Sequence, residues 1–417
     1  MGEVTAPVPG APSGRSPWRV VLLLGPVAAL NYLDRQMLAS MKFSVMADIP
    51  SIANDSNWGL MLGQFKWVYA FLGPVGGYVA DRFSRRWTIA GSLFAWSLIT
   101  WWTGHVRTFP ELLLARSLMG TSEAFYIPAA LALIADWHGE RTRSRAVGLH
   151  QMAIYFGVIA GGFGGYVAEA PNLGWRSAFE VSGAFGMLYA LPLVFLLGPP
   201  PLRGGPSGPT RPSALRAAGE LFSNGAFLLL VLYFTLPALS AWIVRDWLPA
   251  ILKDRFAIGQ GPAGVTATLT WQGAAVVGAA LGGWLSDLWS GRSRRGRIFA
   301  SALGTGLLVP AILGVGLAGS LGSAAGFLVL FGLGWGVFDT NNMPILCRIV
   351  PPGLRATGYG IMNLVSISSG GLADWTLGAL RDRHWPDGAI FGVYSGLALL
   401  SVLVGLLIRP RPEAEAS

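Results

Sequence analysis

The sequence predicts an all-α polytopic membrane protein with twelve transmembrane helices in two pseudo-symmetric six-helix bundles. The chain of 417 residues is 53% hydrophobic and only 12% charged, a composition typical of proteins whose helices lie in lipid. Its 57 glycines and 17 tryptophans agree, because small residues let membrane helices approach closely and Trp favours the membrane interface. A series of apolar runs and an internal repeat supply the number of helices and their division into two bundles.

Twelve apolar runs are separated by Gly, Pro or charged residues, and a helix of roughly 20 apolar residues can cross a bilayer. The runs lie near 19–46, 58–80, 87–104, 110–136, 144–168 and 177–197 in the first half, and near 222–250, 263–287, 298–317, 321–345, 355–379 and 388–408 in the second. We therefore expect a disordered N-terminal tail at 1–18, six-helix bundles at 19–198 and 218–409, a cytoplasmic Pro/Gly/Arg linker at 199–217 and a C-terminal tail at 410–417.

The basic residues are distributed unevenly between the two sides of this arrangement. Of the 30 Lys and Arg residues, 19 fall on the side of the two termini and six on the opposite side. By the positive-inside rule, this bias places both termini in the cytoplasm and predicts a multi-pass protein of the plasma (inner) membrane. It also accounts for the formal charge of +9 without nucleic-acid binding, which we do not expect. The other five basic residues lie within or near the ends of spans: Arg35, Lys42, Lys66, Arg116 and Arg245.

The two halves of the chain repeat short motifs. Gly77-x-x-x-Asp81 follows the second span, and Gly283-x-x-x-Asp287 follows the eighth, 206 positions later. Arg145 opens an Arg-Ala-Val-Gly run at the fifth span, and Arg355 opens an Arg-Ala-Thr-Gly run at the eleventh. In transporters built from repeated halves, the substrate binds between the halves near the midplane, and rocking of the halves alternates access. The repeat therefore predicts a transporter.

A carboxylate at a helix end beside arginines can form an ion-pair latch between the halves, closed in one conformation and broken in the other. We expect such a latch to include Gly77, Asp81, Arg82, Arg85, Arg86, Arg145, Gly283 and Asp287. The run from Gly77 to Arg86 also resembles the G-x-x-x-D-R-x-x-R-R loop signature of the major facilitator superfamily. The resemblance implies the fold of that superfamily.

Within the superfamily, several short runs resemble the anion:cation symporter family. They are Asn31-Tyr32-Leu33-Asp34-Arg35, Arg116 with Glu123, Pro128, the run at Arg145, Gly174-Trp175-Arg176 and Trp247-Leu248-Pro249. That family carries hexonates, hexuronates, sialate and, in animal relatives, glutamate. The resemblance implies a secondary active transporter that moves a small organic anion, such as a sugar acid, together with protons by alternating access.

The same first-helix run and Gly120-Thr121-Ser122-Glu123-Ala124 also resemble the Spinster-like lysolipid transporters. A carrier of lysolipids or other amphiphiles is therefore the alternative function. An intramembrane enzyme is a remote alternative, because the four histidines fall in separate segments without a His-Glu-x-x-His zinc pattern. We predict no enzyme activity, no cofactor and no metal. We expect a monomer whose partners are the organic anion, protons (with Na⁺ as the alternative coupling ion) and membrane lipid.

Asp34 and Arg35 are adjacent charges in the middle of the first span. Each costs roughly 2.5–3.5 kcal/mol there on translocon scales, so such residues normally face a protein-lined cavity. The alternative is that Asp34 and Arg35 pair with other helices and only hold them together. We expect Arg35 to bind the carboxylate of the substrate, because a planar guanidinium can bond a carboxylate in bidentate fashion. Arg35 and Asp34 point about 100° apart around a helix, so they cannot share this role.

Proton coupling is predicted for Asp34 and Glu123, with Arg116 as the neighbouring cation. Arg116 and Glu123 are two turns apart and share one helix face. Further substrate-binding side chains are expected to be Tyr32, Lys42, His150, Gln151, Tyr155, Trp242, Gln272, Asn341, Asn342 and Asn363. Other roles stay open for some of these cations and rings. Lys42 could instead snorkel to the outer surface, His150 could be structural, and Lys66 could line an outer vestibule. Arg245 and Asp246 are expected to pair at the outer end of their span, with anion binding by Arg245 as the alternative.

Overall fold

The computed structural model describes residues 16–198, 214–293 and 295–409, without the side chains of residues 81, 140, 214 and 215. The helices of the first half are α1 (Trp18–Ser40), α2 (Lys42–Asp48), α3 (Asp55–Arg82), α4 (Arg85–Thr103), α5 (Phe109–Glu123), α6 (Tyr126–Trp137), α7 (Glu140–Gly162), α8 (Gly164–Glu169) and α9 (Gly174–Leu196). Those of the second half are α10 (Ala214–Phe222), α11 (Gly225–Asp246), α12 (Leu248–Phe256), α13 (Gln260–Ser290), α14 (Gly296–Leu317), α15 (Leu321–Ile349), α16 (Arg355–Asp382) and α17 (Asp387–Leu407). The only other regular elements in the described ranges are two 3₁₀ turns, Pro50–Ile52 and Pro352–Leu354.

The helices fall on the twelve predicted runs, which confirms the fold class. Four runs are each divided between consecutive helices: α1 with α2, α5 with α6, α7 with α8, and α11 with α12. Boundaries differ by a few residues where a cap decides them: α3 begins at Asp55 because the Asn54 side chain accepts a hydrogen bond from the Asn57 amide. Most of the predicted linker and tails lie outside the described residues, although 214–217 belong to α10.

Seven segments of the described chain are helical, long and apolar enough to cross a membrane by length and composition alone. The remaining predicted spans, α1, α3, α4, α13 and α16, contain intramembrane charges or many Gly, Ser, Thr and Trp residues. These residues lower the mean hydropathy because polar and small side chains contribute little to it.

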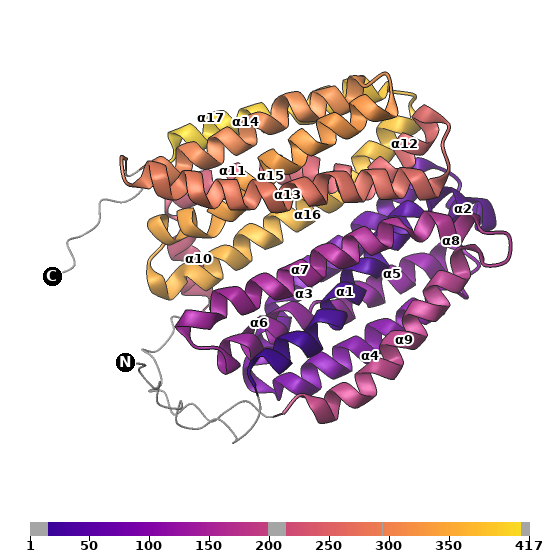
Figure 1. The fold of residues 1–417 in the computed structure, drawn as a ribbon, viewed down its shortest axis with the longest axis horizontal. Helices are drawn as coiled ribbons and strands as arrows, with labels where there is room; N and C mark the ends of the chain where they lie inside the picture. The colour runs from indigo at the N-terminus through magenta and orange to yellow at the C-terminus, as the bar shows by residue number, and fades with distance from the viewer. Residues whose placement is uncertain (1–15, 199–213, 294, 410–417) are drawn as a thin grey trace, which may run out of the picture.

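The helices pack first within each half and then across the middle. In the first half α1 lies against α7 and α4 against α9, and in the second half α13 and α14 both lie against α15. Between the halves, α3 packs along α16, and α7 and α8 pack against α13. Figure 1 shows the two halves side by side, with α2, α8 and α12 gathered at one end. We call that end the distal face, and the opposite end, where α1 begins and α17 ends, the terminal face.

Glycines bring the halves into backbone contact towards the distal face. A Cβ atom on Gly59 of α3 would lie 2.2 Å from the carbonyl oxygen of Asp374 on α16, and one on Gly378 would lie 2.2 Å from the carbonyl oxygen of Asp55. By contrast, a Cβ on Gly77 or Gly283, at the terminal ends of α3 and α13, would meet no atom within 4 Å. The structure therefore represents a conformation in which the halves are closed at the distal face.

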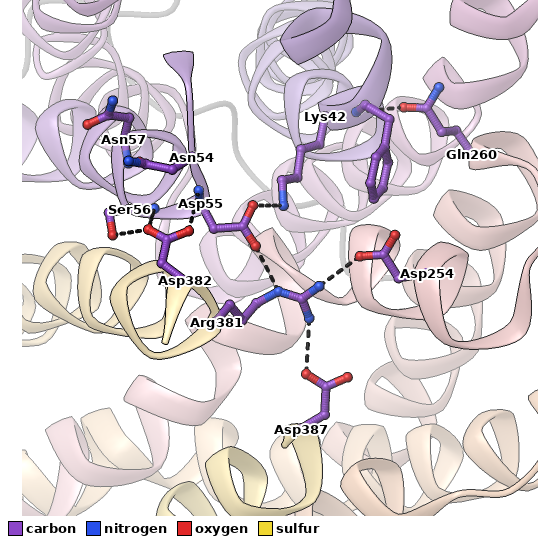
Figure 2. A network of polar contacts seen from close by, with 11 residues as sticks. Lys42, Asn54, Asp55, Ser56, Asn57, Asp254, Gln260, Arg381, Asp382 and Asp387 are labelled. Carbon is purple, nitrogen blue, oxygen red and sulfur yellow. Dashed lines mark hydrogen bonds and ion pairs between the residues drawn. The ribbon is translucent and has the colours of Figure 1, made fainter. Parts of the chain in front are cut away.

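An ion-pair network joins the same helices at the distal face (Figure 2). Arg381, near the end of α16, contacts Asp55 at 2.9 Å, Asp254 at 2.7 Å and Asp387 at 3.0 Å. Lys42 contacts Asp55 at 2.5 Å from the other side. Asp55 thus accepts one cation from each half, so the network stabilises the closed distal face.

Asp382, the last residue of α16, caps the start of α3. Its carboxylate accepts hydrogen bonds of 2.9 Å from the backbone amides of Asp55 and Ser56, where a helix N-terminus has unsatisfied donors. Partial burial raises the pKa of Asp382, but the bonds from the Ser56 side chain and from these amides outweigh it. The pKa therefore lies below its usual value.

We predict that Gly378→Ala destabilises this closed conformation. The added methyl group has no space against the Asp55 carbonyl, and overpacking of this kind typically costs about 1–3 kcal/mol. The melting temperature of the purified protein in detergent should fall. The matched control is Gly360→Ala on the same helix, where a Cβ meets no atom and where Ala should be neutral or stabilising. Equal losses in both variants would contradict the close contact.

We also predict that acid weakens the Asp382 cap. Because its pKa is lowered, its stabilisation is fully present above the ordinary Asp value of about 3.9 and is lost as the pH falls through the lowered value. Spin labels on Asn172→Cys and Gly319→Cys, exposed positions in distal loops of the two halves, would report the separation in a Cys347→Ser background. The labels should move apart below about pH 4, and less so in Asp382→Asn. An identical acid response in that variant would exclude the cap as the cause.

Candidate functional site

A cavity of about 230 Å³ lies between the two halves. Seven of the predicted substrate-binding residues line it: Tyr32, Arg35, Gln151, Tyr155, Trp242, Gln272 and Asn363. Further aromatic side chains, Tyr69, Phe234, Trp271 and Trp335, complete its walls. A concave site that combines aromatic rings with polar side chains such as Arg245, Asp339 and Ser366 is typical of small-molecule binding.

Arg35 of α1 lines the cavity, but its guanidinium is already bound to a carboxylate. Its Nη2 lies 2.5 Å from Oε2 of Glu123, and Nε donates to the same oxygen at 2.7 Å. Asn31, one turn earlier on α1, accepts from Nη2 at 3.1 Å. The Phe65 and Tyr69 rings lie 4.5 Å and 4.8 Å from the guanidinium carbon. Arg35 is 9% exposed and Glu123 is fully buried, so this is a buried ion pair beside the cavity.

The other two predicted coupling residues lie behind this pair. Asp34 is buried and accepts a hydrogen bond of 3.0 Å from Thr100 of α4, so it points away from Arg35 as the helix geometry requires. Arg116 is buried on α5, where its guanidinium lies 4.5 Å from the Phe65 ring and Nη1 contacts the Met119 sulfur at 3.0 Å. The first half therefore holds a compact group of four buried charges.

Two predicted substrate-binding residues of the first half lie away from the cavity. Lys42 belongs to the distal network through Asp55. The first helix ends before Met41, and Lys42 is the first residue of a separate helix, α2. His150 of α7 faces α6, where its Nε2 lies 2.9 Å from the Tyr126 hydroxyl in a buried contact. Neither side chain is positioned to bind a ligand in this conformation.

The two predicted asparagines of α15 are also absent from the cavity lining. Asn341 accepts a hydrogen bond of 2.6 Å from Ser286 and holds α15 against α13. Asn342 donates to Asp339 at 3.3 Å. It is Asp339, one turn earlier, that lines the cavity. The sequence places these residues at the right depth but does not determine which of them faces inward.

The predicted latch is not assembled between the halves among the described side chains. Arg85 pairs with Asp136 inside the first half, and Arg297 pairs with Asp287 at 2.8 Å inside the second. The side chain of Asp81 lies outside the described residues. Arg82 and Arg86 lie over the rings of Tyr78 and Trp87, and Arg145 is exposed. This arrangement agrees with halves that are apart at the terminal face.

Arg245 of α11 lines the cavity. The ion pair that the sequence predicts between Arg245 and Asp246 does not form, because Asp246 pairs with Lys66. The Arg245 guanidinium carbon lies 5.0 Å from the Tyr32 ring and 5.3 Å from the Trp242 ring. Its Nη2 is buried without a hydrogen-bond partner among the described residues. The signal in the sequence was a cation within a span, but the adjacent Asp246 suggested a local pair.

Asp246 instead binds Lys66 of α3. Lys66 Nζ lies 2.5 Å from Asp246 Oδ2 and also contacts Asp374 of α16. The same Nζ lies 4.3 Å from the Trp242 ring, which lines the cavity. Lys66 therefore connects the first half to two acids of the second half, next to the cavity wall.

Comparisons with known proteins agree with this architecture. A family model described as the Major Facilitator Superfamily matches residues 24–373. Spinster homolog 1 of Homo sapiens is 30% identical over 437 residues, which cover 95% of this chain and 80% of that protein. Spinster homolog 1 of Rattus norvegicus is 33% identical over 258 residues, 58% of this chain, and the match spans about half (47%) of that protein. The crystal structure of a bacterial homologue of the human lysosomal transporter Spinster, inward-facing and unoccupied, superposes with a TM-score of 0.76. It is 23% identical, and the match covers 95% of both chains.

We predict that Glu123→Ala strongly destabilises the protein. It leaves the buried Arg35 guanidinium without its carboxylate, a loss that typically costs about 3–5 kcal/mol. The double variant Glu123→Ala with Arg35→Leu should recover much of this stability, because neither member of the ion pair is then left without the other. Denaturation midpoints in detergent would measure the stability of the single variant and of the double variant. Glu180→Ala, which removes a half-exposed carboxylate, is the control and should change stability little. A double variant as unstable as Glu123→Ala would contradict the ion pair.

Proposed function

This chain belongs to the Major Facilitator Superfamily, a family of multi-pass membrane transporters, and we propose that it carries an amphiphilic organic anion by proton-coupled alternating access. The relatives include Spinster homologues, and the sequence runs resemble lysolipid transporters of that kind. The preferred substrate class is therefore a lipid-like molecule with a negative head group. The bundles 19–198 and 218–409 are proposed to rock as two bodies, with both termini in the cytoplasm.

The observation that carries the proposal is the Nη2 atom of Arg245, which is buried without a hydrogen-bond partner among the described residues. A buried arginine donor without a partner is costly, and an anionic head group in the cavity would supply the missing acceptor. Tyr32 and Trp242 flank this guanidinium and would contact the apolar part of the same ligand. An anion at Arg245 with an apolar body along the aromatic wall matches the groups that line the cavity.

Proton coupling is proposed to arise from competition at Arg35. An anion that reaches Arg35 displaces the Glu123 carboxylate, and a buried carboxylate without a cation binds a proton rather than remain charged. Ligand and proton then enter the binding site together. Asp34 and Arg116, which lie close behind, are proposed to adjust to this exchange of charge.

A sugar acid is the second candidate substrate. Gln151, Gln272 and Asn363 line the cavity and could bond hydroxyl groups, while Trp242 and Trp271 offer faces on which a sugar ring can stack. In the opposite conformation, the Gly77 and Gly283 motifs are proposed to meet across the terminal face and form the latch.

We predict that Arg245→Leu weakens ligand binding by about 10–100-fold, the usual range for a lost hydrogen bond to a charged group. A thermal-shift screen of the purified protein with lysolipids, sugar acids and neutral sugars would measure binding, because a ligand raises the melting temperature by mass action. Arg383→Leu, an exposed arginine at the distal face, is the control and should bind normally. Stabilisation by sugar acids alone would select the second candidate, and stabilisation by neutral sugars alone would exclude an anionic substrate.

We further predict that Glu123→Gln separates binding from coupling. The amide cannot exchange a proton, so proteoliposomes should lose proton-driven accumulation while the thermal shift with ligand persists. The Cys347→Ser variant serves as a control that keeps every charge. Undiminished proton-driven uptake by Glu123→Gln would show that coupling does not depend on this carboxylate.

A further inference from the structure

Lys66 forms a buried charge cluster with Asp246 and Asp374 at the boundary between the halves. This cluster is separate from the ion pair of Arg35 and Glu123. Lys66 is 3% exposed, Asp246 is 8% exposed and Asp374 is fully buried. The lysine Nζ contacts Oδ2 of both acids, at 2.5 Å for Asp246. One ammonium thus serves two carboxyl groups, and the cluster carries one excess negative charge when all three groups are ionised.

Two further cations attract Asp246, but neither forms an ion pair with it among the described residues. Arg245 lies beside Asp246 on α11 and within electrostatic range of it, but its guanidinium lies against the Tyr32 and Trp242 rings. Arg116, from α5, is within electrostatic range of Asp246, but its guanidinium faces Phe65 and Met119.

From α17, the Tyr394 hydroxyl donates to a backbone carbonyl at 3.4 Å and brings no charge. Among the described residues, the ion pairs of Asp246 and Asp374 are both with Lys66, and Oδ1 of Asp374 has no hydrogen-bond partner. In a dry interior, two carboxyl groups that share one cation are expected to hold one proton between them.

We propose that Lys66, Asp246 and Asp374 form a proton-binding site that is occupied when the distal face is closed and releases its proton when that face opens. The site lies where the halves part, because Lys66 belongs to α3 and both acids belong to the second half. Opening would hydrate all three groups, so the carboxyl groups would no longer need a shared proton. The proposal rests on the alternating access of the proposed function but uses none of its coupling residues.

Trp242 links this proton site to the cavity. Its ring covers the Lys66 ammonium at 4.3 Å and also lines the cavity. The ring is held against α16, since a Cβ on Gly370 would lie 2.4 Å from a Trp242 ring atom. A ligand that shifts this ring would therefore change the surroundings of Lys66. Ligand binding in the cavity and proton binding at the cluster would then both act on the contact between α3 and the second half.

The distance between the distal labels, Asn172→Cys and Gly319→Cys in the Cys347→Ser background, tests the proposal in the full chain in lipid nanodiscs between pH 5 and pH 8. This range lies above the titration of the Asp382 cap. Acid should shift the population towards the closed distal face, by up to about tenfold per pH unit for one proton. Asp374→Asn, a neutral isostere of the protonated acid, should stay closed and lose the pH response. Asp246→Asn provides a second variant should the first fail to fold.

The outcomes separate this site from the proposed coupling site. A response that persists in Glu123→Gln and disappears in the Asn variants supports the proposal. A shift towards the open face in acid, or an undiminished response in both Asn variants, overturns it. If Glu123→Gln alone abolishes the response, this proposal fails and the proposed function stands. If uptake is not proton-driven but the Asp374-dependent response is present, the proposed coupling fails and this site stands.

Discussion

The buried ion pair of Arg35 and Glu123 constrains the first half of the molecule. A guanidinium at this depth is tolerated only with a carboxylate close to it, and 2.5 Å separates the two groups. The pair fixes the rotation of α1, sets the end of α5 against it and draws aromatic rings over the cation. Because the pair borders the cavity, the group that holds the helices together also faces the place where a ligand would bind.

Much of the fold could be predicted because it depends on properties that a single sequence displays. Hydropathy gave the spans, and the repeat of Gly77 and Asp81 at Gly283 and Asp287 indicated two halves. The position of Arg35 at the cavity could be predicted for a related reason. A charged side chain in the centre of a span is costly in lipid and normally faces the interior of the bundle. Its depth and residue type together therefore indicate an interior cavity.

The errors have a common physical origin. Depth along a helix can be counted, but the direction of a side chain and its partner across the molecule cannot. Lys42 lies beyond a break at Met41 that changes its direction, and Asn341 and His150 face neighbouring helices instead of the cavity. Arg245 has an acidic neighbour in the sequence, but that neighbour, Asp246, binds a lysine 180 positions away. Pairing over such distances is a property of the assembled fold.

The glycines between α3 and α16 have a consequence for how the two helices separate. Where backbone meets backbone at Gly59 and Gly378, neither helix inserts a side chain into a pocket of the other. These two contacts can separate without a rotamer change, whereas further along the same helices the Trp67 side chain donates to the Ser368 carbonyl at 3.0 Å and has to be released. At Gly59 and Gly378 the closed contact is therefore held by the ion pairs around it, such as Arg381 with Asp55, rather than by interlocking side chains.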